Sequence, residues 1–116
     1  MAKIERFEDI LAWQESKNLC MGIYAAFKNC RDYAFRDQIQ RAAVSVMNNV
    51  AEGYERKGNK EFAKFLYIAK GSCGEVRSLL YLANDLGYIH KDDFDKFHDK
   101  SLHISSMLSN FIKSLR

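Results

Sequence analysis

The chain has 116 residues, no proline, 47% hydrophobic residues and 28% charged residues. This length fits one domain, and the hydrophobic share is too high for a disordered chain. The absence of proline excludes a collagen-like or proline-rich fibrous protein and favours helices over a turn-rich all-β domain. Eighteen Lys and Arg against fifteen Asp and Glu give a net charge of +3, which alone indicates no class of partner.

Apolar residues at helical spacing predict four amphipathic helices joined by short polar breaks. The expected helices span about residues 7–29, 33–55, 60–86 and 92–115 of one domain, residues 1–116. The first range has Ile10 and Leu11 together on its apolar stripe. Asp32 and Asn59 are suitable N-caps for the second and third helices, and Gly87 is a suitable C′ glycine after the third. This pattern predicts an all-α, up-down-up-down four-helix bundle.

The third predicted helix carries a second stripe beside its coiled-coil-like core seam. The stripe consists of Phe65, Ile68, Ser72, Glu75, Leu79, Leu82 and Leu86. In a small bundle each helix keeps one side in water, so we expect one stripe to face another subunit. The expected interface residues are Phe65, Ile68, Ser72, Leu79 and Leu82. A wide core face within a single protomer is the alternative.

A polar stripe runs along the second predicted helix. It consists of Gln38, Arg41, Ser45, Asn49 and Glu52. Ser, Asn and Gln at this spacing indicate hydrogen bonds to another helix, since a solvated face would be richer in Lys and Glu. We expect a structural network that includes Glu75, with Arg41 paired to Glu75 or Glu52. A merely polar surface stripe is the alternative.

A basic cluster spans the break between the second and third predicted helices. It consists of Arg56, Lys57, Lys60, Lys64 and Lys70, with Tyr67 on roughly the same outer face. Such cations contact phosphates, and a tyrosine among them stacks on an unpaired base. We therefore expect these six residues to form a nucleic-acid-binding surface, which an oligomer would repeat. A solvated outer face is the alternative.

The Gly71-Ser72-Cys73-Gly74 segment has the spacing of a nucleic-acid-clamping Gly-x-x-Gly loop. It lies in the middle of a predicted helix rather than in a loop. Small residues at such a place indicate the close approach of a neighbouring helix.

No residue pattern indicates catalysis, a metal or a cofactor. The three cysteines are odd in number and contain no Cys-x-x-Cys pair, the three histidines are scattered, and no serine lies in a nucleophile-elbow motif. We expect a protein that is not an enzyme. Free thiols, an N-terminal stretch unlike a secretory signal and the lack of a long apolar run are typical of a cytoplasmic protein with no membrane partner.

Several of these blocks together resemble a bacterial family of four-helix bundles named for open reading frames in 23S rRNA intervening sequences. The blocks are Phe7-Glu8-Asp9-Ile10, Trp13, Gln38-Ile39, Arg41-Ala42-Ala43, Ser45, Asn49, Ala51-Glu52-Gly53, Glu61-Phe62, Phe65-Leu66, Ala69, Gly71-Ser72, Glu75 and Leu86-Gly87-Tyr88. The separation between Ala51-Glu52-Gly53 and Gly71-Ser72 is the specific part. The chain departs from the family at Met47 and between the first two helices, where relatives usually carry proline.

The resemblance implies an up-down protomer of a ring-like homo-oligomer, a pentamer, with no catalytic residues. A related protein, the accessory variability protein of diversity-generating retroelements, binds nucleic acid and works beside a reverse transcriptase. We therefore expect a noncatalytic oligomer that binds structured RNA or DNA, with a reverse transcriptase or another protein as a further partner. A protein-interaction scaffold without a nucleic-acid role is the alternative.

Overall fold

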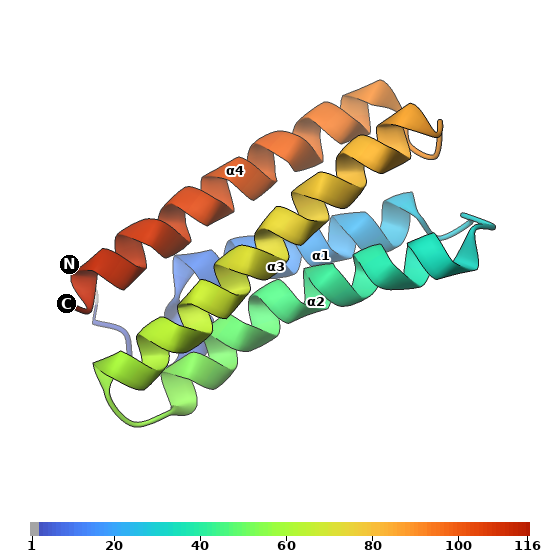
Figure 1. Ribbon diagram of the computed structural model, residues 1–116. Helices are drawn as coiled ribbons and strands as arrows, with labels where there is room; N and C mark the ends of the chain where they lie inside the picture. The colour runs from blue at the N-terminus through green and yellow to red at the C-terminus, as the bar shows by residue number, and fades with distance from the viewer. Residues whose placement is uncertain (1–2) are drawn as a thin grey trace.

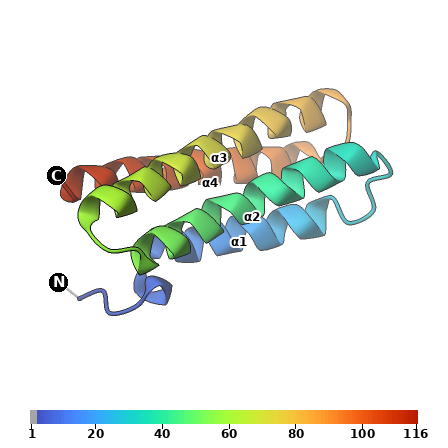
Figure 2. The same ribbon diagram turned by 60° about the horizontal axis from the view of Figure 1, so that its bottom comes forward.

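The computed structural model describes residues 3–116 as four long helices arranged as an up-down-up-down bundle (Figure 1). The elements are the 3-10 turn η1 (Phe7–Asp9) and the helices α1 (Leu11–Ala26), α2 (Tyr33–Glu55), α3 (Asn59–Asp85) and α4 (Lys91–Ser114). Each helix packs against the next one in the chain, and α4 packs against α1 to close the bundle. Figure 2 shows the α3–α4 pair lying over the α1–α2 pair.

The first helix is shorter than the periodicity predicts. Ile10 has an extended backbone, with φ −79° and ψ 119°, and separates η1 from α1, which ends at Ala26. The side chain of Gln14 donates a 2.8 Å hydrogen bond to the backbone carbonyl of Glu8, which competes with a continuous helix. This break leaves Ile10 2% exposed but Leu11 65% exposed, so the expectation that both lie on one buried stripe is wrong.

Local hydrogen bonds explain how the other helices begin and end. The side chain of Asp32 accepts a 3.1 Å hydrogen bond from the N–H of Phe35, which confirms the expected cap of α2. Asn59 is the first residue of α3 rather than its cap, because Gly58, with φ 86°, occupies the cap position. The chain leaves α3 through Gly87, whose φ of 73° favours glycine, as the sequence predicts.

The core seam predicted for α3 is buried along its whole length. Its residues are Phe62, Leu66, Ala69, Cys73, Val76, Leu80 and Ala83. Apolar side chains from α1, α2 and α4 complete one continuous core. Within the described part of the chain, no helix is long and apolar enough to cross a bilayer.

Candidate nucleic-acid interface

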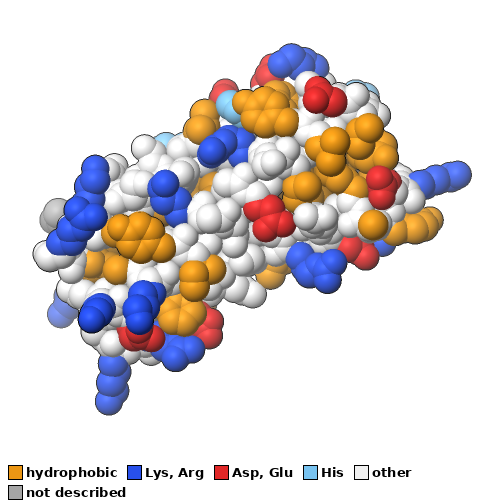
Figure 3. Space-filling model, viewed as in Figure 1, with side chains coloured by type: hydrophobic (Ala, Val, Ile, Leu, Met, Phe, Trp, Pro, Cys, Tyr) orange, Lys and Arg blue, Asp and Glu red, His pale blue; other side chains and the backbone are white. Residues whose placement is uncertain are grey.

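The basic cluster lies at the end of the bundle where the α2–α3 loop meets the C-terminal end of α4 (Figure 1). Figure 3 shows Lys and Arg side chains gathered at this end of the face that α3 occupies. Lys113, in the last turn of α4, and Arg116 are also exposed at this end. Sequence reasoning missed both residues, although the even number of antiparallel helices predicts that the last helix ends beside the start of the third.

Some cations of the cluster already have partners within the chain. Arg56 pairs with Glu52 at 3.3 Å, and its guanidinium lies 4.9 Å from the ring centre of Phe65. Lys64 pairs with Glu61 at 3.5 Å. Both ion pairs are largely exposed, and such pairs are weak because water screens them. These cations therefore remain accessible to a polyanion at low energetic cost.

Other cations of the cluster have no carboxylate partner among residues 3–116. Lys57 and Lys60 are exposed and form no ion pair there, and the same is true of Lys113. Their positive charge is therefore not neutralised locally. Lys70 differs, because it is half-buried on the side of α3 that contains Cys73.

Cys73 is a core residue of α3 next to the basic cluster. Burial raises the pKa of the Cys73 thiol to about 11, against the opposing effect of the nearby Arg77 and Lys70 cations. The thiol donates to the backbone carbonyl of Ser101 at 3.2 Å. Cys73 is therefore a protonated core residue at neutral pH, which agrees with its place in the seam.

The expected polar network joins α2 to α3 within the single chain. The hydroxyls of Ser45 and Ser72 lie 2.8 Å apart, and the side chain of Asn49 donates to the Ser45 hydroxyl at 3.0 Å. The amide of Gln38 donates to the carboxylate of Glu75 at 3.5 Å. These contacts hold the two helices in register.

Arg41 does not form the ion pair with Glu75 or Glu52 that the sequence suggests. It is exposed and forms no ion pair with any residue the structure describes. Gln38 reaches the carboxylate of Glu75, and Glu52 pairs with Arg56 one turn further along its own helix. The expected pairing of Arg41 with Glu75 or Glu52 is therefore not formed.

The second stripe of α3 divides into two parts. Three of its residues make contacts within the chain. Ser72 forms a hydrogen bond to α2, the Phe65 ring forms a cation–π contact with Arg56, and Leu79 is partly buried against the core. Ile68 and Leu82 are instead about half exposed, as is Leu86. A Cβ placed at Gly71 or Gly74 would meet no atom within 4 Å, so packing within the chain does not require either glycine.

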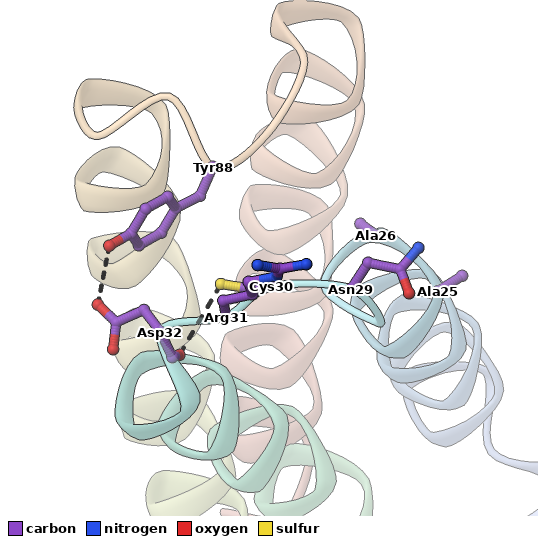
Figure 4. Close-up of a pocket in the computed structure, with 7 residues that line it drawn as sticks. All are labelled: Ala25, Ala26, Asn29, Cys30, Arg31, Asp32 and Tyr88. Carbon is purple, nitrogen blue, oxygen red and sulfur yellow. Dashed lines mark hydrogen bonds between the residues drawn. The ribbon is translucent and has the colours of Figure 1, made fainter.

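A hollow of about 480 Å³ lies at the opposite end of the bundle, between the α1–α2 loop and Tyr88 (Figure 4). The Tyr88 hydroxyl donates to the Asp32 carboxylate at 2.8 Å, and this bond raises the pKa of Tyr88. The other carboxylate oxygen of Asp32 accepts from the N–H of Phe35. Both carboxylate oxygens of Asp32 therefore accept hydrogen bonds from other parts of the fold. The residues that line the hollow include no histidine that could act as the base of a nucleophile–base pair.

A sequence profile of the family described as 23S rRNA-intervening sequence protein matches residues 8–110. The chain belongs to this family. The match confirms the resemblance carried by the Ala51-Glu52-Gly53 and Gly71-Ser72 blocks. No curated protein matches the chain.

The fold is similar to that of a crystal structure from Bacteroides thetaiotaomicron, which is described as a protein of unknown function from the S23 ribosomal protein family. The TM-score is 0.83 and the sequence identity 21%, over 89% of this chain and 99% of that chain. At this identity the similarity establishes the shared helical fold alone.

Proposed function

We propose that this protein is a noncatalytic cytoplasmic homo-oligomer that binds structured RNA or DNA through its basic end. The observation that carries the proposal is the gathering of exposed, unneutralised cations at one end of a chain whose net charge is only +3. Lys57 and Lys60 have no carboxylate partner among the described residues, and Lys113 adds a third such charge. Cations placed in this way gain free energy from phosphates through the release of condensed counterions.

The proposed oligomer is supported by the exposed part of the second stripe. Ile68, Leu82 and Leu86 present apolar surface to water on one helix. A Cβ at Gly71 or Gly74 would meet no atom within 4 Å, although a glycine within a helix costs roughly 0.5–1 kcal/mol relative to alanine. A second copy of the chain packed against α3 would account for both features. We propose the ring-like pentamer that the family resemblance implies, in which several basic ends act together.

Binding to a folded RNA hairpin and a DNA hairpin, measured by fluorescence anisotropy over a range of salt concentrations, tests the proposal. The test variant replaces Lys57, Lys60 and Lys64 with Gln. The matched control replaces Lys17, Lys28 and Lys96, which are exposed elsewhere on the bundle. We expect the test variant to bind more weakly. The slope of the logarithm of its binding constant against the logarithm of the salt concentration should be shallower by about one unit per lost phosphate contact. Absence of binding at low salt, or equal loss in both variants, would contradict the proposal.

The second candidate function is a scaffold that binds another protein, such as a reverse transcriptase. The half-exposed Ile68, Leu82 and Leu86 favour this function if the chain is a monomer, because their apolar surface would then be available to a different partner. Light scattering coupled to size-exclusion chromatography separates the two candidates. A monomer that binds neither hairpin would favour the scaffold.

A further inference from the structure

We infer that the basic end selects unpaired nucleotides, with a base stacked on Tyr67 and neighbouring phosphates on Lys60 and Lys64. The inference rests on the proposed function, because it names the state of the nucleic acid that the same surface binds. It depends on the surroundings of the Tyr67 ring and on the spacing of the two lysines.

The aromatic ring of Tyr67 makes no specific contact with any other described side chain. It is 54% exposed, and within residues 3–116 it forms no hydrogen bond, ring–ring contact or cation–π contact. Most other tyrosines of the chain pack against a ring or a cation, namely Tyr33, Tyr54, Tyr81 and Tyr88. Tyr24 alone resembles Tyr67, but it lies on α1, away from the basic cluster. The Tyr67 ring is therefore available to an external partner.

Lys60, Lys64 and Tyr67 form one row along the surface of α3. Their spacing of four and three residues places successive side chains on the same side of the helix, about 6 Å and about 4.5 Å apart along its axis. Lys60 has no carboxylate partner in the described chain, and the pairing of Lys64 with Glu61 is exposed and weak. Cations in line with an exposed aromatic ring are typical of surfaces that bind single strands.

Tyr67 does not belong to the exposed apolar stripe of α3 that we propose as a subunit contact. Ile68, which belongs to the proposed subunit interface, projects about 100° away from Tyr67 around the helix. A base stacked on Tyr67 therefore does not compete with the contact proposed for Ile68.

The Tyr67 ring distinguishes unpaired from paired nucleotides. In a duplex, neighbouring bases cover both faces of each base, and proteins contact A-form helices mainly through phosphates and 2′-hydroxyls. A ring on the surface of a convex helix cannot reach a base inside such a stack. The lysines contribute to binding of both forms, whereas Tyr67 contributes only to binding of an unpaired base.

The test compares two labelled probes, a short oligouridylate that does not fold and an RNA duplex of the same length, at low salt. The proteins are wild type, Tyr67→Ala, Tyr67→Phe and the matched control Tyr24→Ala, each checked for helical content by circular dichroism. We expect Tyr67→Ala to weaken binding of the oligouridylate by about 5- to 100-fold and to leave duplex binding within about twofold. Tyr67→Phe, which keeps the ring, and Tyr24→Ala should bind both probes like wild type.

The outcomes separate the inference from the proposed function. If wild type binds neither probe, both are overturned. If wild type binds the probes but Tyr67→Ala has no effect, or weakens both probes equally, the inference alone is overturned. A loss of oligomer in Tyr67→Ala without a selective loss of oligouridylate binding would instead assign Tyr67 to a subunit contact and would also overturn the inference.

Discussion

Gly53 of α2 lies so close to Phe65 of α3 that a Cβ at position 53 would be 2.6 Å from the Cβ of Phe65. The same Cβ would be 3.0 Å from the Cδ1 of Phe62. A ring edge can rotate away from such a contact, but the Cβ of Phe65 moves only with its backbone. The missing side chain at position 53 therefore sets the distance between α2 and α3 next to the loop that carries the basic cluster.

Replacing Gly53 with Ala should destabilise the fold. Forcing an extra carbon into a packed contact costs about 1–3 kcal/mol, which exceeds the roughly 0.5–1 kcal/mol that Ala gains over Gly within a helix. Urea unfolding followed by circular dichroism should show a lower midpoint for Gly53→Ala. An unchanged or higher midpoint would mean that the two helices separate without cost.

Replacing Gly71 or Gly74 with Ala should stabilise the single chain and weaken the proposed oligomer. Because the added Cβ meets no atom within 4 Å, each change should raise the free energy of unfolding of the dilute protomer by about 0.5–1 kcal/mol. If a neighbouring subunit approaches α3 there, the same change should weaken the oligomer in sedimentation velocity experiments. An assembly of unchanged strength would place the subunit contact elsewhere.

Asp32→Ala should destabilise the end of the bundle shown in Figure 4. The change removes the N-cap of α2, which alone is worth about 1 kcal/mol, and also the acceptor for the Tyr88 hydroxyl. Asp32→Asn, which keeps a capping oxygen, is the matched control and should lose less. Urea midpoints measured on both variants check this order, and equal midpoints would show that the cap does not limit stability.

Because of Tyr88, the free energy of unfolding should fall at alkaline pH. Its hydrogen bond to Asp32 is the main reason that its pKa is raised, so the folded protein favours the protonated phenol. This contribution is fully present below the unfolded pKa of about 10 and is lost as the pH rises through the higher folded value. Between about pH 9 and 11, the unfolding midpoint of Tyr88→Phe should therefore fall less steeply than that of wild type. Parallel curves would show that the bond is not maintained in solution.

The three cysteines should differ sharply in reactivity. Cys20 and Cys73 are buried and burial raises the pKa of both thiols, whereas Cys30 is partly exposed in the α1–α2 loop. Since the thiolate is the reactive form, iodoacetamide at neutral pH should alkylate Cys30 first in the native protein. Mass spectrometry of the digested protein reads each site separately. Rapid modification of Cys73 would mean that α3 and α4 separate readily.

Hydrophobic periodicity was sufficient to place the four helices and the buried seam of α3, because burial repeats with the turn of a helix. The Asp32 cap and the Gly87 terminus followed from residue types with well-defined local roles. The break at Ile10 did not follow from the apolar pattern, which does not register the side-chain bond from Gln14 to the backbone of Glu8 found there.

The packing of the helices settled how residues from different segments meet. It left Arg41 without the expected partner and left Gly71 uncovered. A one-dimensional pattern tells which side of a helix is buried. It does not tell the rotation and axial offset of one helix against another, and contacts between side chains change completely over a few ångströms of that offset.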